Sequence, residues 1–307
     1  MNPHPSTDLS AISKFPIFSK YNYLMKHEIQ LLTKNLPPYA DFSIQVMELW
    51  FNANNDLELS NVHGNILFSF TDLLDANLLK YYFGGLANVN DSINLIKESG
   101  SINKLSCVPR ETIDSLDVEN KLQIHEDRDS FEYLLCVEEQ INLTGSKFGK
   151  YRRKVNTLID QIGASIETVQ LDLNDGKNRA KLIQLHSAWE TRNDPEGNEI
   201  RAIQQALNRH KELGYNCLVI TVDGEIHGFT LYFIHTDGRT ANISHTKSSY
   251  KYDNLFDYIV HSTARQLQKR GVDRMNFEMD LGIPGLRMHK MGLRPCSFFE
   301  KFTIDFS

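Results

Sequence analysis

Residues 275–290 hold most of the side chains in this sequence that could act together in a reaction. Two carboxylates, an amide, a guanidinium, an imidazole and an ammonium fall within this stretch: Asn276, Glu278, Asp280, Arg287, His289 and Lys290. The pattern predicts a strand over 274–279, a loop broken by glycine and proline, and one or two helical turns from Leu286. Because N–H groups at the start of a helix bind anions, Gly285 and Arg287 could stabilise a developing negative charge.

The two carboxylates of this stretch are the candidate acid–base groups. Glu278 and Asp280 are two residues apart, so both face the same side of the predicted strand, where either could bind an acceptor amine or remove its proton. The alternative is structural: Asp280 pairs with Arg287 or Lys290 and braces the turn. If the chemical role holds, changing Asp280 to alanine abolishes activity in a protein that still folds.

A cationic run lies near the middle of the chain. Five of the eight residues from 147 to 154 are basic: Lys147, Lys150, Arg152, Arg153 and Lys154. On a helix, Lys147, Lys150 and Lys154 would share one side, with Arg153 nearby. Guanidinium and ammonium groups bind phosphate, so the run predicts contact with a phosphate-bearing partner. A solvated helix face is the alternative.

His245 ends a predicted strand and is the remaining catalytic candidate. Its ordinary pKa lies near neutrality, so it could act as a general base for an amine nucleophile. The alternative is a histidine that hydrogen-bonds at a strand edge. The sequence contains no Walker loop, no G-x-S-x-G, no H-E-x-x-H and no metal-ligand spacing, so we expect no metal site.

Bulk composition narrows the class of protein. A chain of 307 residues, 41% hydrophobic and 23% charged, is long enough for two globular domains. Its net charge of −6 argues against a protein that coats nucleic acid over its whole surface. Four widely spaced cysteines, no signal peptide at the N-terminus and no long apolar run lead us to expect a cytoplasmic protein.

A charge-rich stretch over 117–129 predicts a boundary between an N-terminal domain, 1–129, and a C-terminal domain, 130–307. In the first domain we expect a helix within 15–36 and a hairpin over 57–70. In the second domain, the pattern predicts a strand over 131–137, followed by helices within 145–162, 181–189 and 200–210. Three antiparallel strands over 217–245 and a helix over 256–267 come next. A strand, a helix and a last strand over 298–306 complete the domain. This order resembles the acyltransferase fold called GNAT.

Two motifs resemble a known family. Residues 276–295 match a signature of the phosphatidylglycerol lysyltransferase C-terminal-like family at Asn276, Asp280, Leu281, Gly282, Gly285, Leu286, Arg287, Lys290 and Pro295. Residues 132–156, in which an acidic-Tyr-Leu strand leads to the basic helix, resemble its second signature. The resemblance implies an α+β fold of two tandem GNAT-like domains, each a mostly antiparallel sheet flanked by helices, with the site in the C-terminal one.

The family's best-known members transfer an aminoacyl group from aminoacyl-tRNA to a phospholipid headgroup. The resemblance therefore implies an acyl or aminoacyl transferase that acts on a soluble or lipid acceptor. The basic run would bind the phosphates of the donor, and Asn276, Gly285 and Lys290 would belong to the substrate site.

Two other functions stay open. The chain could be an acyl-CoA-dependent N-acyltransferase, although acetyl-CoA enzymes of the GNAT fold cradle the pyrophosphate in a glycine-rich loop and residues 246–255 contain no glycine. It could also be a binding protein for RNA or a phosphorylated ligand that catalyses nothing. The acyl donor is thus either aminoacyl-tRNA or acyl-CoA.

Overall fold

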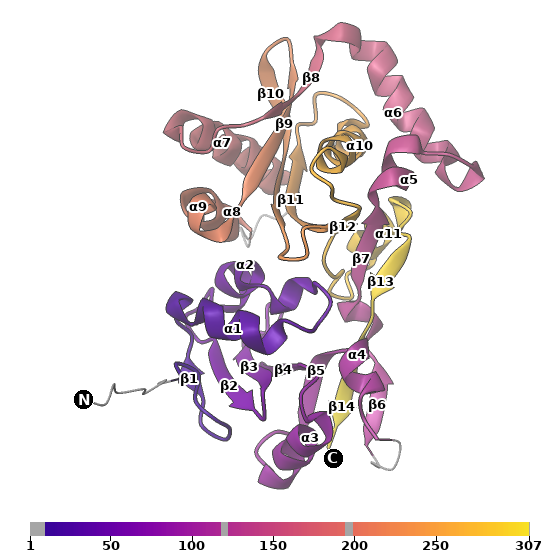
Figure 1. The fold of residues 1–307 in the computed structure, drawn as a ribbon. Helices are drawn as coiled ribbons and strands as arrows, with labels where there is room; N and C mark the ends of the chain where they lie inside the picture. The colour runs from indigo at the N-terminus through magenta and orange to yellow at the C-terminus, as the bar shows by residue number, and fades with distance from the viewer. Residues whose placement is uncertain (1–9, 118–121, 194–198, 307) are drawn as a thin grey trace, which may run out of the picture. The chain divides into compact units, whose positions relative to one another are not determined.

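The structure is a computed structural model that describes residues 10–117, 122–193 and 199–306. Contacts divide the chain into an N-terminal unit, Met1–Arg128 with Glu300–Ser307, and a C-terminal unit, Asp129–Phe299 (Figure 1). This division differs from the predicted domains at the end of the chain. The predicted last strand over 298–306 is two strands, one in each unit, because Lys301–Asp305 pairs with strands of the N-terminal sheet.

The N-terminal unit contains a seven-stranded sheet in the order β1-β2-β3-β4-β5-β14-β6. Its strands are β1 Ser19–Lys20, β2 Glu58–Val62, β3 Asn65–Thr71, β4 Leu79–Gly84, β5 Lys104–Pro109, β6 Gln123–Glu126 and β14 Lys301–Asp305. Its helices are α1 Lys26–Thr33, α2 Ile44–Val46, α3 Val89–Ser99 and α4 Arg110–Asp114, with short helical turns at Tyr23–Met25, Ala40–Phe42 and Met47–Phe51. The predicted hairpin is confirmed by the β2–β3 pairing. The predicted helix over 15–36 is shorter, since Ser19–Lys20 pairs with β2 instead.

The C-terminal unit contains a second seven-stranded sheet in the order β13-β7-β12-β11-β10-β9-β8. Its strands are β7 Glu132–Cys136, β8 Ile166–Gln170, β9 Asn216–Val222, β10 Glu225–Ile234, β11 Thr240–Ser248, β12 Arg274–Asn276 and β13 Ser297–Phe299. Its helices are α5 Val137–Asn142, α6 Gly149–Ile162, α7 Gly176–Asn193, α8 Ile200–Asn208, α9 His210–Leu213, α10 Leu255–Gln268 and α11 Pro284–Gly292. Within this sheet only β11 and β12 pair in parallel among the described residues.

Helices cover both faces of the C-terminal sheet (Figure 1). On one face α10 packs closely: a Cβ added at Gly228 of β10 would lie 2.4 Å from Ile259 Cδ1, so any larger residue there would require the Ile259 side chain to move. On the other face lies α7, where the Trp189 ring covers Lys247 of β11. One face of β11 therefore packs against α10 and the other against α7. The polar residues described below lie on the α7 face.

No helix in the described ranges is long and apolar enough to span a bilayer.

Candidate active site between two diverging strands

The candidate site lies where β11 and β12 separate. Their parallel pairing covers only three residue pairs and ends at Asn242 and Asn276. Beyond that point β11 runs on to Ser248 along β10, while the chain after β12 turns toward β7, where Phe277 N donates to Tyr133 O at 2.9 Å. The predicted strand over 274–279 thus ends early, and one edge of β11 is left without a strand partner from Ile243 onward among the described residues.

A buried lysine holds the chain in its path after β12. Lys290 Nζ donates to the carbonyls of Phe277 at 2.6 Å, Glu278 at 3.3 Å and Met279 at 2.6 Å. Glu278 has a φ of 58°, which breaks the alternation of a strand, so Glu278 and Asp280 do not share a strand face as predicted. Burial lowers the pKa of Lys290 to about 8, although Glu278 and Asp280 act to raise it. These contacts indicate that Lys290 positions the backbone of this loop.

Asp280 is fully buried in a network that braces the same loop. It accepts hydrogen bonds from Arg287 Nε at 2.9 Å, Arg287 Nη2 at 2.8 Å, Gly282 N at 2.9 Å and the Tyr133 hydroxyl. Burial raises the pKa of Asp280, but these hydrogen bonds and the charge of Arg287 outweigh it and lower the pKa overall. Arg287 also pairs with Asp129. The geometry therefore favours the bracing alternative for both residues over the predicted catalytic roles.

Asn276 connects the loop to the neighbouring strand. Its Nδ2 donates to Glu132 of β7, and its Oδ1 accepts from the backbone N–H of Glu278 at 2.9 Å. Asn276 and Glu132 are both fully buried, so this pair lies inside the sheet and orients Glu278. Gly285 lies in the first turn of α11, which begins at Pro284, two residues before the predicted start at Leu286. It is exposed, with open space where a Cβ would be.

Glu278 spans the opening between the strands. Its Oε1 accepts from Asn242 Nδ2 at 2.6 Å, and the same nitrogen lies 3.1 Å from Ser244 Oγ. Asn242 is fully buried, and its Oδ1 has no hydrogen-bond partner among the described residues. The opening therefore presents a carboxylate beside an unused amide acceptor. Asn242 is not among the residues predicted from the sequence, because residues 240–245 show the pattern of a strand and no motif that distinguishes Asn242 as a functional residue.

A β-bulge brings His245 to the same face of the sheet as Asn242. Asn242 pairs with Phe233 and His245 with Leu231, two positions apart on β10, with an irregularity between them. Burial lowers the pKa of His245 to about 4, with Lys247 and His186 acting in the same direction against Glu199. His245 lies within β11, which runs on to Ser248, and not at the end of a strand as predicted. It is a neutral and weak base at pH 7, which disfavours the predicted general-base role.

The polar strip continues along β11 to a second pair of charges. Lys247 pairs with Glu199, and its Nζ lies 3.4 Å from the centre of the Trp189 ring. Glu199 Oε1 is also 3.9 Å from His245 Nδ1. Burial raises the pKa of Glu199, but Lys247 and His245 lower it by more, so Glu199 stays ionised. Sequence reasoning named His245 but missed Trp189, Glu199 and Lys247, because the members of this cluster come from separate segments of the chain.

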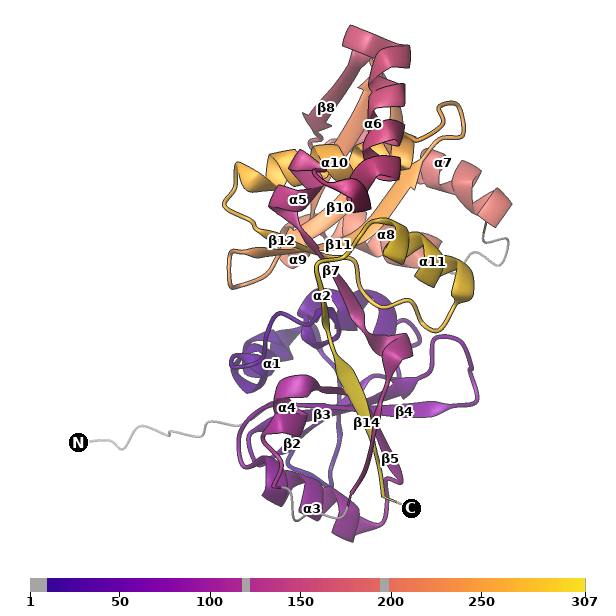
Figure 2. The same ribbon diagram turned by 90° about the vertical axis from the view of Figure 1, so that its right-hand side faces the viewer.

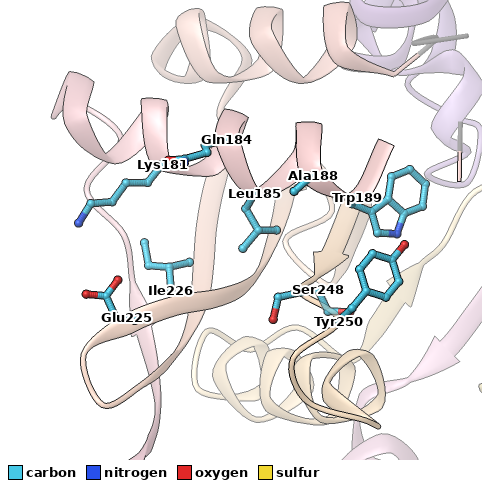
Figure 3. Close-up of a pocket in the computed structure, with 10 residues that line it drawn as sticks. Lys181, Gln184, Leu185, Ala188, Trp189, Glu225, Ile226, Ser248 and Tyr250 are labelled. Atoms are coloured by element: carbon cyan, nitrogen blue, oxygen red, sulfur yellow. The ribbon is translucent and has the colours of Figure 1, made fainter. Parts of the chain in front are cut away.

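A cavity of about 370 Å³ lies beside this cluster, between α7 and the ends of β10 and β11. Figure 3 shows Lys181 and Glu225 at one end of it and Trp189 and Tyr250 at the other. Leu185, Ala188 and Ile226 supply most of the wall between them. The cavity suits an elongated, largely apolar group.

Comparison with known proteins places these residues in a family. The family described as "Phosphatidylglycerol lysyltransferase, C-terminal" matches residues 109–304, more than half of the chain. The chain belongs to this family. Among curated proteins, no match to the sequence was found.

Solved structures share the fold. A conserved protein of unknown function from Bacteroides thetaiotaomicron has a TM-score of 0.78 at 20% identity and covers 94% of this chain and 99% of its own. The C-terminal domain of a protein described as a lysylphosphatidylglycerol synthetase from Agrobacterium fabrum has a TM-score of 0.61 at 12% identity, covering 93% of each chain. L-PGS from Bacillus licheniformis has a TM-score of 0.59 at 13% identity, covering 91% of each. The tandem GNAT-like α+β fold expected from the sequence is confirmed.

The basic run of this lysyltransferase-family chain is largely paired within the protein. Lys147 Nζ is 2.7 Å from Glu139, and Lys154 Nζ is 2.9 Å from Asp257. Arg152 donates to the carbonyls of Leu143 and Gly145 at the end of α5. Lys147 also precedes α6, in a short helical turn. Two exposed residues of the run, Lys150 and Arg153, form no ion pair with any described residue, so a phosphate-binding surface here would rest on these two.

Neutralising Lys150 and Arg153 tests this surface. We expect K150Q/R153Q to weaken binding of a tRNA or other phosphate-bearing donor and to reduce the slope of log K against log salt by about 1–2, since each phosphate contact contributes roughly 0.7–0.9. Binding is measured from 50 to 300 mM NaCl. The matched control is K211Q/K269Q, which removes two exposed lysines elsewhere in the unit. Equal slopes in both double variants would exclude the surface.

Proposed function

We propose that this chain is an acyl or aminoacyl transferase whose donor enters the opening between β11 and β12. The observation that carries the proposal is the Glu278 carboxylate held across that opening by Asn242. An amine or hydroxyl that attacks an acyl carbonyl must lose a proton, and a fixed carboxylate can accept it. Glu278 is our candidate for that base, acting on an acceptor in the opening.

The unpaired edge of β11 supplies a second requirement of acyl transfer. Carbonyl attack places negative charge on the acyl oxygen, and backbone N–H groups fixed in advance stabilise that charge. The edge of β11 beyond Asn242 has no pairing with β12, so its N–H groups can face a donor lodged there. In this proposal Asn276, Asp280, Arg287 and Lys290 hold the loop that carries Glu278, and none of the four takes part in the reaction.

The α7 face supports the placement of the acceptor. Asn242, His245 and Lys247 form one polar strip on that face, and the cavity beneath α7 adjoins its far end. An acceptor with an apolar body could lie in the cavity and present its amine or hydroxyl toward Glu278. The acceptor itself can be soluble or a lipid.

Aminoacyl-tRNA is the donor we favour. The connection from β11 to α10, residues 249–254, contains no glycine, and its last residue, Asn254, takes the left-handed conformation that glycine often supplies, with φ 64°. Such a connection lacks the loop that cradles the pyrophosphate of acyl-CoA. The exposed cations Lys150 and Arg153 support a larger phosphate-bearing donor.

Binding and turnover of candidate donors test this function. We expect charged tRNA to raise the melting temperature by about 5–10 °C at roughly 100 times its Kd, and to lose its aminoacyl group when an acceptor is present. Uncharged tRNA and acetyl-CoA, measured in parallel, should stabilise less. Thiol release from an acyl-CoA would instead establish the N-acyltransferase alternative. Salt-sensitive tRNA binding with no product under any condition would favour a binding protein.

A further inference from the structure

The turn between β3 and β4 in the N-terminal unit exposes a cluster of leucines. Leu73 is 39% exposed, Leu74 63%, Leu78 47% and Leu79 50%. We call residues 72–79 the leucine turn; it joins the end of β3 to the first residue of β4, and Figure 2 shows both strands. Among the other described residues of this unit, the large exposed apolar side chains of Ile17, Leu24 and Leu31 stand singly along the sequence. Exposing one leucine is ordinary, but four in one turn indicate a contact surface.

Five backbone N–H groups of the leucine turn are hydrogen-bonded within it. Asp72 Oδ1 accepts from the N–H groups of Leu74 and Asp75, both at 2.8 Å, and Asp75 Oδ1 accepts from Asn77 N at 2.9 Å. Asp72 N donates to Leu78 O at 2.8 Å, and Leu78 N donates to Asp75 O at 3.0 Å. The backbone donors named here therefore need no water, while the leucine side chains reach solvent. This pairing lowers the cost of moving the backbone of the turn into the interfacial region of a bilayer, where the exposed Asp75 carboxylate can stay at the level of the headgroups.

The turn carries little net charge: residues 72–80 hold two carboxylates, Asp72 and Asp75, and one cation. Asp72 forms an ion pair with Lys80, which follows the turn in β4. Between residues 72 and 80 this is the only cation in the sequence, so the turn carries no basic cluster that would attract an anionic surface. Any contact it makes must be driven by burial of leucine rather than by charge.

The size and shape of the surface point to its occupant. The exposed fractions of the four leucines add up to about two complete leucine residues. That falls well short of the roughly 800 Å² that each partner buries in a stable protein complex. A bilayer, in contrast, accepts a small apolar protrusion without shape complementarity, because its acyl chains rearrange around it.

We propose that the leucine turn inserts into the interfacial region of a lipid bilayer. It thereby gives the N-terminal unit a membrane-docking site that needs no spanning helix. The proposal concerns a different unit from the candidate active site, so it stands or falls independently of the transfer reaction.

Vesicle co-sedimentation of the full chain tests the docking site. Probes are vesicles of phosphatidylcholine alone and of phosphatidylcholine with 30% phosphatidylglycerol, each at 0.1 and 0.5 M NaCl. We expect the protein to pellet with both, with little change between salt concentrations, and L74S/L78S to lower the partition coefficient at least tenfold. The matched control is L24S, which removes a leucine that is 84% exposed outside the turn and should leave partitioning unchanged. Thermal unfolding confirms that all variants fold.

Three results would overturn the proposal. The first is equal partitioning of L74S/L78S and the unchanged protein, and the second is no pelleting with either vesicle. The third is a concentration-dependent dimer in light scattering that L74S/L78S abolishes, which would make the leucine turn a contact between protein chains.

Discussion

Changing Glu278 to glutamine is expected to lower kcat by about 10²–10⁴-fold, the range typical for loss of a general base. Glutamine keeps the size of the side chain and an oxygen that can accept the hydrogen bond of Asn242, so the loop after β12 should keep its path. The change thus removes the proton acceptor and little else. The measurement is single-turnover transfer with saturating donor, beside the melting temperature of both proteins.

The control for this experiment is another carboxylate changed to its amide. Glu167 of β8 is exposed and lies outside the candidate site, so E167Q should leave kcat unchanged. Turnover of E278Q within a few-fold of the unchanged protein, with the same melting temperature, would remove Glu278 as the base. Weaker donor binding with unchanged kcat would instead assign the carboxylate to substrate binding.

Changing Asp280 to alanine is expected to destabilise the C-terminal unit by about 2–3 kcal/mol. The change leaves the Tyr133 hydroxyl and part of the Arg287 guanidinium without their acceptor in a buried network, and such losses cost about 3–5 kcal/mol when both partners are fully buried. The Arg287 side chain is 35% exposed, so solvent recovers part of that cost. Urea unfolding at pH 7 measures the difference.

The dependence of the free energy of unfolding on pH, measured at acidic pH, gives a second test of the same network. The pKa of Asp280 is lowered in the folded protein, so its ionised form contributes stability above pH 4, and this contribution is lost as the pH falls through the lowered value. D280A should therefore show a flatter loss of stability below pH 4. D129A removes the 62% exposed second partner of Arg287 and should change stability by less than about 1 kcal/mol.

The outcome for D280A also separates its two suggested roles. A destabilised protein with reduced transfer fits a brace that positions Glu278. A protein of unchanged stability that has lost all transfer would restore Asp280 to the reaction itself, as the sequence pattern alone predicts.

Local pattern determined most of the secondary structure of this protein and the region of its candidate site. The Asp-Gly turns and alternating runs predict three antiparallel strands, which are present as β9, β10 and β11. Turn chemistry and apolar periodicity act over a few residues, so one sequence is enough to detect them. The signature over 276–290 likewise located the loop beside the opening.

Tertiary structure decided what each residue of that region does. The sequence predicts a strand up to Met279, but three bonds from Lys290, eleven or more residues later, end it at Asn276. Burial lowers the pKa of His245 and so makes it a weak base. Two of the five basic residues of the run form ion pairs within the protein, with Glu139 and Asp257. Asn242, which holds Glu278, carries no local signal at all.

The physical reason is the same in each case. A side chain's partners and its desolvation depend on segments that folding brings together, and no periodicity within one segment records them. The sequence by itself therefore indicated the family and the fold, and it named the stretch in which we place the candidate site. Only the tertiary structure shows that Asp280, Arg287 and Lys290 brace the loop after β12. It also shows that Glu278 of this loop contacts Asn242 where β11 and β12 separate.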